Sequence, residues 1–503
     1  MTTVRLVSTD AAATKADALV VGVVKTPRGV ALAPGSESVN AAFDGQLVQL
    51  LRALGATGKE DELTRVPSRG VVAATVVAAV GLGEAPPKDA AYDHEQLRRA
   101  AGAAMRKLDG SGSVTTTLAL VGGAPTAGVV GAVAEGLLLG AYRFRRYRSD
   151  NGKNPPSRAS VLVSAKPDRD LQAAVRRAEA LATAVSLTRD LVNTPAGDLN
   201  PTTLAATARD VAAEATLEIE VLDEKALRKG GYGGLLGVGA GSTNPPRLIR
   251  LAYRAPGAEK TIALVGKGVT FDSGGLSIKP AQAMEWMKAD MGGAAAVIGA
   301  MQAIATLKPN VNVIGYAPAA ENMPSGTAIR PSDVLTMYGG KTVEVTNTDA
   351  EGRLIMADAI TRAHADEPDI IIDIATLTGA ALVALGSRTA GVMANDDVLR
   401  SGVVTAAGRA GEAMWPMPLP PELRGSLDST VADLVNTGDR YGGMLVAGLF
   451  LQEFVDGVRW AHLDIAGPAF NQGEAFGYTP KGGTGAGVRT LVQLIEDVAA
   501  GEI

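Results

Sequence analysis

Short apolar runs alternate with stretches of helical spacing along most of the chain. Strands are predicted where β-branched and other apolar residues cluster, over 18–24, 71–80, 114–121, 261–265, 311–316, 369–374 and 460–465. Helices are predicted where apolar residues recur every three or four positions, over 95–108, 169–192, 294–304, 352–365, 398–410 and 489–499. This alternation predicts crossover connections, and therefore an α/β fold around a mixed, mostly parallel sheet flanked by helices.

The segment 143–158, RFRRYRSDNGKNPPSR, interrupts this pattern with the most basic and most breaker-rich sequence of the chain. Such a segment between apolar regions is typical of a domain junction. We therefore expect two domains, a smaller N-terminal α/β domain over 1–158 and a larger catalytic domain over 159–503. The role of the smaller one, in oligomerisation or regulation, is left open by the sequence.

Composition narrows the chemistry mainly through what is scarce. The chain has no Cys and only three His among 503 residues. A Cys nucleophile, a thiolate zinc site, an iron–sulfur cluster and a disulfide scaffold are therefore all excluded. If the protein binds metal, carboxylates must supply most of the ligands.

Charge and hydropathy bear on location and partners. The 48 basic and 53 acidic residues leave a net charge of 48 − 53 = −5, which argues against a surface built mainly for nucleic acid. The N-terminal 24 residues lack the basic start and cleavage site of a signal peptide, and the longest uncharged stretch, 110–134, is broken by Pro125 and several Gly. We expect a cytoplasmic protein that neither spans nor binds a membrane.

The first cluster of candidate functional residues begins where the strand 261–265 ends. The sequence GKGVTFDSGGLSIKP, residues 266–280, carries Lys267, Asp272 and Lys279 among four glycines, and Asp290 follows before a helix of small residues. Glycines at φ > 0 would let the backbone aim these side chains at one point. Parallel sheets also collect their chemistry where strands end, so this loop is a candidate site.

The second cluster is NTDAEGRL, residues 347–354, with Asp349, Glu351 and Arg353 at alternate positions. In an extended segment the three side chains would project to one side. Carboxylates held close together are costly unless a cation compensates them. The four carboxylates of the two clusters carry −4, which two divalent ions would balance; the four are Asp272, Asp290, Asp349 and Glu351.

Two such ions would lower the pKa of a bridging water and clamp the reacting atoms of a hydrolysis. Lys267 could then serve as a neutral amine ligand beside the ions. A cationic Lys279 would polarise a carbonyl and hold the developing oxyanion. Arg353 is too basic to act as a general base, but its guanidinium could hold bicarbonate, an anionic base, through two hydrogen bonds.

These motifs together resemble one family, the leucyl (cytosol) aminopeptidases, which are exopeptidases with two divalent ions. The likeness runs from about 193 to 498 and rests on VGKGVTFDSGGLSIKP (265–280), MKADMGG (287–293), NTDAEGRL (347–354), DIATLTG (373–379), NTGDRYGG (436–443) and WAHLDIAG (460–467). Several long motifs agree in order and spacing, so the chain is identified as a bacterial-type member of this family.

The resemblance implies a role for each matching position. The metal ligands would be Lys267, Asp272, Asp290, Asp349 and Glu351, with Asp272 and Glu351 bridging two Mn²⁺ or Zn²⁺ ions. Catalysis would use Lys279 on the carbonyl and Arg353 with bicarbonate. The pocket for the N-terminal side chain, preferentially leucine or another apolar residue, would include Met287, Thr376, Gly379 and Ala466. The substrates would be peptides with a free N-terminus, and the assembly a homohexamer, a dimer of trimers.

Two other functions compete with this one. A carboxylate-held pair of ions suits a phosphoesterase as well as a peptidase. The net charge argues against an additional DNA-binding or scaffolding role, but the basic run 143–158 keeps it open.

Overall fold

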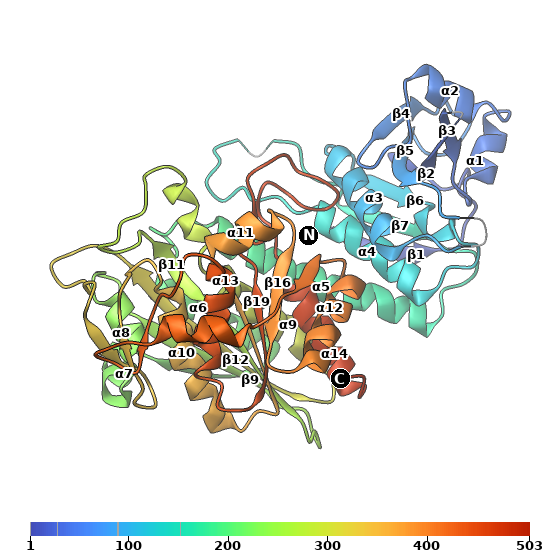
Figure 1. Cartoon of the computed structure of the whole chain (residues 1–503). Helices are drawn as coiled ribbons and strands as arrows, with labels where there is room; N and C mark the ends of the chain where they lie inside the picture. Colours follow the sequence, from blue (N-terminus) through green and yellow to red (C-terminus); the bar gives the residue numbers. More distant parts are fainter. Residues whose placement is uncertain (1, 28, 88–89, 151) are drawn as a thin grey trace. The chain divides into compact units, whose positions relative to one another are not determined.

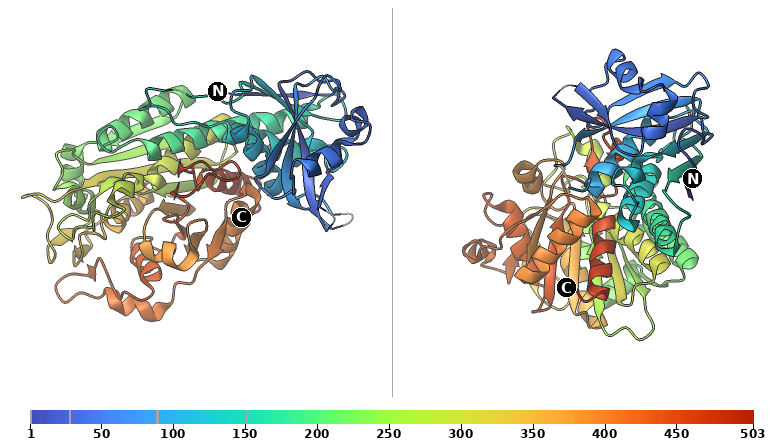
Figure 2. Two further views of the ribbon diagram at one scale, coloured as in Figure 1. Left: turned by 90° about the horizontal axis from the view of Figure 1, so that it is seen from above. Right: turned by 90° about the vertical axis from the view of Figure 1, so that its right-hand side faces the viewer.

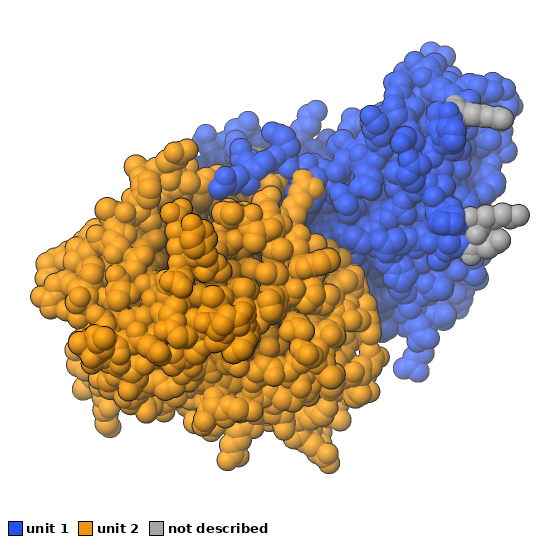
Figure 3. Space-filling view, in the orientation of Figure 1, with its two compact units in different colours: residues 1–182, 472–481 blue, residues 183–471, 482–503 orange. Residues whose placement is uncertain are grey.

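The computed structural model describes residues 2–27, 29–87, 90–150 and 152–503. The chain forms two compact units, shown in different colours in Figure 3: unit 1 contains residues 1–182 and 472–481, and unit 2 contains 183–471 and 482–503. Helix α5 (Arg169–Asn193) belongs partly to each. The 158/159 domain boundary, which stays a prediction, lies inside unit 1 ahead of this helix.

Unit 1 is built on a sheet with the strand order β1-β7-β6-β2-β5-β4, in which β3 also pairs with β2. The sheet is parallel except at β3 and β4. Its strands are β1 (Thr3–Val7), β2 (Ala18–Thr26), β3 (Gly29–Leu32), β4 (Leu63–Pro67), β5 (Val76–Glu84), β6 (Ser113–Thr116) and β7 (Arg158–Leu162). Its helices are α1 (Glu37–Ala42), α2 (Leu47–Ala53), α3 (His94–Lys107), α4 (Ala127–Gly140) and the first part of α5.

Two strand predictions in unit 1 are partly wrong, and local hydrogen bonds explain why. The run 114–121 leaves the sheet after Thr116, whose hydroxyl accepts from the backbone N–H of Leu118 and turns the chain into a short 3₁₀ helix. The run 71–80 enters the sheet only at β5, because its first residues form a loop closed by the bond from Ser68 N to Thr75 O.

Unit 2 contains a mixed sheet of nine strands with the order β17-β16-β19-β15-β10-β12-β9-β8, and β11 continues beside β12. The four central strands are mutually parallel, which confirms the mostly parallel sheet. They are β10 (Thr261–Gly266), β12 (Asn312–Asn322), β15 (Ile370–Ala375) and β19 (Arg459–Asp464). The flanking strands are β8 (Glu218–Leu222), β9 (Arg247–Tyr253), β11 (Gly268–Asp272), β16 (Ala390–Ala394) and β17 (Met414–Pro416).

Helices cover both faces of this sheet, as Figures 1 and 2 show. One face packs against α9, with α6 and α14 next to it and α12 beyond α14, and the other against α8 and α10, with α13 next to α10. These helices are α6 (Pro201–Ala215), α8 (Gly233–Gly239), α9 (Gly292–Leu307), α10 (Gly352–Ala363), α12 (Asp397–Ala410), α13 (Gly443–Gln452) and α14 (Val488–Ala499). The central strands are mostly apolar and buried on both sides, which is why they read as nearly continuous apolar runs in the sequence.

The remaining elements of unit 2 are short. They are α7 (Glu224–Gly230), α11 (Gly379–Leu385), β13 (Val334–Thr336), β14 (Thr342–Glu344), β18 (Leu434–Val435), β20 (Phe470–Asn471), β21 (Gly482–Gly483) and three 3₁₀ helices, η2 (Met284–Ala289), η3 (His364–Asp366) and η4 (Pro421–Leu427). Most of them lie in the loops that follow the central strands, so they shape the edge of the sheet where the candidate site is found.

One helical stretch, Met284–Leu307, is long and apolar enough to cross a membrane by length and composition. It contains η2 and α9, and 83% of its most apolar window is buried inside the protein. This burial is that of a core helix packed on a sheet.

Candidate metal centre

The predicted site residues converge at the carboxyl ends of the central strands of unit 2. Lys267 follows β10 directly, Asp272 ends β11, and Thr376 follows β15. Glu351 lies immediately before α10 and Asp290 two residues before α9, and these two helices pack on opposite faces of the strands. The crossover topology therefore brings segments about 80 residues apart in sequence to one edge of the sheet.

Lys267 lies at the centre of this group and is buried, with 2% of its surface exposed. Its Nζ lies 2.7 Å from Asp290 Oδ2 and 2.9 Å from Glu351 Oε1, and it donates to the carbonyl oxygen of Thr376 at 3.0 Å. The side chain passes so close to Gly352 that a Cβ there would lie 2.3 Å from Lys267 Cε. A side chain at the first position of α10 would therefore displace the end of Lys267 from the carboxylates.

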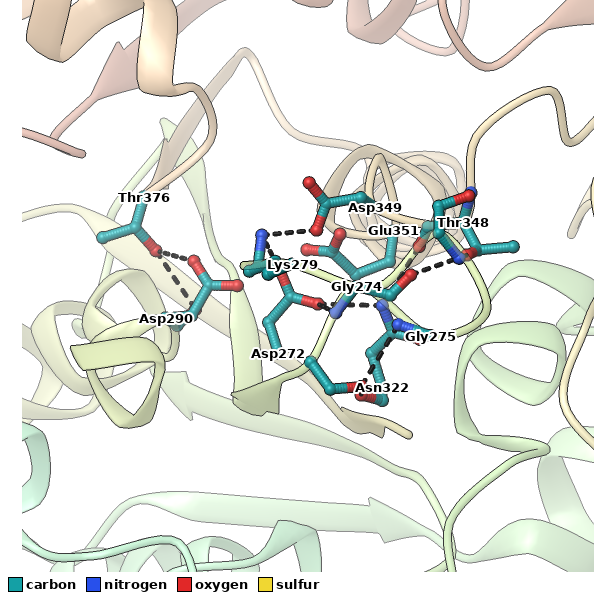
Figure 4. A network of polar contacts seen from close by, with 12 residues as sticks. Asp272, Gly274, Gly275, Lys279, Asp290, Asn322, Thr348, Asp349, Glu351 and Thr376 are labelled. Atoms are coloured by element: carbon teal, nitrogen blue, oxygen red, sulfur yellow. Dashed lines mark hydrogen bonds and ion pairs between the residues drawn. The ribbon is translucent and has the colours of Figure 1, made fainter. Parts of the chain in front are cut away.

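Lys279 joins the other two carboxylates, as Figure 4 shows. Its Nζ lies 2.7 Å from Asp272 Oδ2 and also forms an ion pair with Asp349. The loop between Asp272 and Lys279 turns through Gly274, which has φ +85° and no room for a Cβ beside Ser277 O. The predicted positive φ is found at Gly274 and at Gly275, which has φ +64°, but not at Gly266 or Gly268, which lie in strands.

The extended conformation predicted for 349–353 is wrong. Asp349 lies in a turn, and Glu351 already has helical angles, φ −76° and ψ −37°, as the residue that precedes α10. Arg353 then lies in the first turn of the helix. The turn and the helix start, rather than strand alternation, bring Asp349 and Glu351 to the same centre. An anionic side chain at this end of α10 is also favoured by the helix dipole.

Burial raises the pKa of Asp272, Asp290 and Asp349, because the interior of the protein solvates a carboxylate poorly. For Lys267 and Lys279 burial alone would lower the pKa, but the surrounding carboxylates outweigh it and hold both values above the ordinary one. Four carboxylates with two lysines leave a deficit of positive charge. The centre therefore favours cations.

The donor geometry of the centre fits a metal. Carboxylate oxygens of Asp272, Asp290 and Glu351 lie within 4.8 Å of one another. Glu351 Oε2 is buried and has no hydrogen-bond partner among the described residues, which is costly for an ionised oxygen without a cation. A ligand set of carboxylate oxygens and one amine nitrogen suits divalent ions such as Mn²⁺, Mg²⁺ or Zn²⁺. Asp349 is linked to this group by Lys279, which forms ion pairs with both Asp272 and Asp349.

Arg353 is buried beside the carboxylates. Its Nη1 donates to Asn436 O at 2.7 Å, and its guanidinium lies 6.0 Å from the ring centre of Phe450. Burial lowers the pKa of Arg353 to about 10, against the opposing effect of Glu351 and Asp464. Its Nε has no hydrogen-bond partner in the described part of the chain, so this donor is among those left for an anion.

The four residues expected to line the side-chain pocket come from three loops at the same edge. Met287 lies in η2 and is half-buried, Gly379 begins α11, and Ala466 follows β19. The Thr376 hydroxyl donates to Asp290 Oδ1 at 2.8 Å, so it also orients a carboxylate of the centre. How these residues contact a substrate stays a prediction.

Three polar residues that hold the centre were not predicted from the sequence. Asp464 ties together the loops after β15 and β19, because its carboxylate accepts from Leu377 N and Ala466 N and from a threonine hydroxyl. Asn436 and Asn322 hold the turn before Glu351. The signal for Asn322 is a polar residue at the end of a buried apolar strand, which the sequence displays.

Asn436 fixes the turn 346–350 from one side. Its Oδ1 accepts from Thr346 N at 2.8 Å and Asn347 N at 3.2 Å, and its Nδ2 donates to Asn347 O at 2.7 Å. The residue is completely buried. The side-chain amide of Asn436 thus bonds the backbone of this turn as a neighbouring strand would. The backbone carbonyl of Asn436 accepts the hydrogen bond from Arg353.

Two family models match the chain. One, described as the cytosol aminopeptidase family, catalytic domain, matches residues 186–492, and the other, the N-terminal domain of the same family, matches residues 20–151. The chain is 55% identical to a probable cytosol aminopeptidase of Streptomyces coelicolor over 100% of both chains. It is 51% identical to one of Rhodococcus erythropolis, covering 98% of this chain and 97% of the relative.

Solved structures are similar over nearly the whole chain. The bottromycin maturation enzyme BotP in complex with Mn has a TM-score of 0.85 and 41% identity, covering 96% of this chain and 100% of that one. A variant of tomato leucine aminopeptidase has a TM-score of 0.86 and 32% identity, covering 99% and 96%. The similarity therefore covers both units.

Proposed function

The chain belongs to the cytosol aminopeptidase family and is a metallo-exopeptidase that removes residues from peptide N-termini, and we propose that it does so at a centre of two divalent ions. The proposed ligands are Lys267, Asp272, Asp290, Asp349 and Glu351. The observation that carries the proposal is the acidic excess of the centre, with one buried Glu351 oxygen left without a partner among the described residues.

When bound, such ions would activate a water for attack and anchor the free α-amine of the substrate. Mn²⁺ is the first candidate, because the solved BotP complex contains Mn, and Zn²⁺ is the second, from the ligand types. Lys267 would bind as a neutral amine, since a nearby divalent ion favours loss of its proton. In the structure its amine already faces Asp290 and Glu351, the carboxylates that would share the ion.

Lys279 is proposed to polarise the scissile carbonyl. Its side chain is 21% exposed to solvent, whereas that of Lys267 is 3% exposed. A substrate could therefore reach Lys279 while Lys267 stays covered. A fixed cation placed where negative charge develops stabilises the transition state without reorganisation at the moment of reaction.

Arg353 is proposed to hold bicarbonate as the general base. One donor of its guanidinium is bonded to Asn436 O, and Nε is without a partner among the described residues. A guanidinium matches the planar oxygens of bicarbonate in two parallel hydrogen bonds. The anion would accept the proton of the attacking water, which Arg353 itself cannot do.

The side-chain pocket is proposed to take leucine and other apolar N-terminal residues. Met287 and the apolar edges of Thr376, Gly379 and Ala466 offer little to bond a polar side chain. Asp464 accepts hydrogen bonds from the backbone of the two loops that carry Thr376 and Ala466, so it would fix the positions of these two pocket residues relative to each other.

Assembly and location follow the family. We propose a homohexamer, a dimer of trimers, in the cytoplasm, with no membrane association. Light scattering on the purified protein would test the hexamer, and a trimer or monomer would contradict it.

The other two functions have less support. Membership of an aminopeptidase family speaks against the two-metal phosphoesterase. The support for a DNA-binding role is the basic segment 143–158. Two of its arginines make contacts within unit 1, since Arg143 forms an ion pair with Asp109 and Arg145 donates a hydrogen bond to Asn154. DNA retention that weakens steeply with salt would restore this role.

The test is a metal and substrate scan. The purified protein is stripped with a chelator and assayed on leucyl amide, other aminoacyl amides and a phosphate ester, before and after Mn²⁺ or Zn²⁺ is returned. The expected result is loss of leucyl amide hydrolysis on stripping, recovery with metal, and no ester turnover. Full activity of a metal-free preparation would contradict the proposal.

A further inference from the structure

Asn322 is a buried amide at the last residue of β12, with 2% of its surface exposed. The parallel pairing of β11 with β12 sets Asn322 beside Asp272. Its Nδ2 donates to Asp272 Oδ1 at 2.8 Å and to the carbonyl oxygen of Thr348 at 3.0 Å. Figure 4 shows this amide between the two segments.

The orientation of the amide follows from its partners. A carboxylate oxygen and a backbone carbonyl can only accept, so the atom that faces both must be the NH₂ group. Each of its two hydrogens has one acceptor. The Asn322 amide is therefore committed to bridging Asp272 and Thr348.

The first of these bonds orients the carboxylate of Asp272. Its Oδ1 accepts from Asn322 and from Gly274 N, at 2.8 and 2.9 Å, while Oδ2 faces Lys279 at 2.7 Å. One oxygen is thus held by the chain and the other is turned toward the centre. Glu351 differs, because its Oε2 has no such donor in the described chain.

The second bond sets the position of the turn that carries Asp349. Thr348 accepts from Asn322 through its carbonyl, and its hydroxyl donates to Gly274 O at 2.6 Å and accepts from Ser277 N at 2.8 Å. The loop after Asp272, the turn before Glu351 and the end of β12 are therefore tied at one point.

We propose that Asn322 is a positioning residue of the metal centre: it holds Asp272 and the turn of Asp349 at the separation that ions require. The inference rests on the proposed function, because it presupposes metal binding by these residues. Hydrogen-bonding partners of metal ligands fix ligand orientation, and their loss typically weakens metal affinity by roughly 10- to 100-fold.

The test compares two asparagines of one strand. Asn312, at the other end of β12, accepts from Ala255 N at 3.1 Å and donates to Ala258 O at 3.5 Å, so Asn312→Ala is the control of the same residue type for Asn322→Ala. The full chain is stripped of metal and titrated with Mn²⁺ alone, and free Mn²⁺ is followed by electron paramagnetic resonance. Asn322→Ala should bind Mn²⁺ about 10- to 100-fold more weakly than wild type, and Asn312→Ala as wild type does.

Three further readouts separate positioning from folding. The metal-free melting temperature of Asn322→Ala should fall by no more than a few degrees below that of Asn312→Ala, because the lost amide is buried, and its kcat should recover near the wild-type value at saturating Mn²⁺. Asn322→Thr keeps a hydrogen-bond donor in a side chain of similar volume, so it should bind Mn²⁺ with an affinity between those of wild type and Asn322→Ala. If the alanine variant does not fold, the Mn²⁺ affinity of Asn322→Thr tests the inference in its place. Unchanged Mn²⁺ affinity in the folded variants would overturn the inference. Absence of Mn²⁺ uptake by wild type would instead overturn the proposed metal function.

Discussion

The two ends of α10 both hold charge that is largely shielded from solvent, yet they differ in the balance of acid and base. At its N-terminal end, Glu351 belongs to a group of four carboxylates that share two lysines. After its C-terminal end, Asp366 is a single carboxylate within 4.0 Å of three arginines, Arg250, Arg254 and Arg362. Buried charge alone therefore does not distinguish a site from a structural ion pair.

The pKa values differ in the same direction as the charge balance. Burial would raise the pKa of Asp366, but hydrogen bonds from Arg250 and Tyr316 outweigh it and lower the value. At the other end burial prevails, and the carboxylates Asp272 and Asp290 have raised pKa values. An acidic excess that the protein itself does not neutralise is what indicates a cation site.

The sharpest test of this contrast removes one carboxylate from each end. Glu351→Gln should lower kcat/KM by about 10³-fold or more, because loss of a ligand forfeits several kcal/mol of charge stabilisation. Bound metal, measured by mass spectrometry of the purified protein, should fall as well. Asp366→Asn should keep both metal and turnover. A Glu351→Gln enzyme with full metal content and activity would remove the distinction between the two ends.

Two lysines near the N-terminal end of α10, Lys279 and Lys288, should differ in their effect on catalysis. Lys279→Met should leave metal content near normal while lowering kcat by about 10²-fold, since an oxyanion partner acts on the transition state. Lys288→Met is the control, because Lys288 lies near the centre but donates to Asn193 O. An unchanged kcat in Lys279→Met would take this lysine out of the mechanism.

The arginines near α10 should separate by their response to bicarbonate. Arg353→Met should lower activity by about tenfold and abolish stimulation by added bicarbonate, given the ~1.5 kcal/mol of one charge-assisted hydrogen bond. Arg362→Met, at the structural end, should keep the bicarbonate response. Initial rates in carbonate-free buffer with graded additions provide the measurement, and equal responses in the two variants would contradict the role of Arg353.

The smallest effect is expected on stability at the structural end. Asp366 has a lowered pKa in the folded state, so it contributes stability above the unfolded value of about 3.9 and loses it as pH falls through the folded value. Asp366→Asn should lower the melting temperature by a few degrees at pH 7, with a smaller difference from wild type near pH 3. Scanning fluorimetry across that range tests this, and a pH-independent difference would contradict the ion-pair explanation.

Much of the site could be predicted because its residues lie in contiguous motifs next to readable strands. Lys267, Asp272, Asp290 and Glu351 follow apolar runs or precede helices, and the structure brings all four together. The extended conformation predicted over 349–353 is wrong because charges at alternate positions occur here in a turn followed by a helix, and Glu351 directly precedes that helix. Asn322 and Asn436 were missed because a lone amide, even one that ends an apolar strand, does not show its role until its hydrogen-bond acceptors are known.

The sequence by itself determined the chemistry available to this protein. The absence of Cys, the few His and the two carboxylate-rich motifs left an oxygen-held metal site as the consistent choice, and strand–helix alternation determined a mostly parallel sheet. Only the tertiary structure decided which oxygens face the centre, which lysine is covered, and which amides hold the ligands apart. Those properties depend on strand register and on contacts between segments far apart in sequence, such as Asn322 with Asp272 and Thr348.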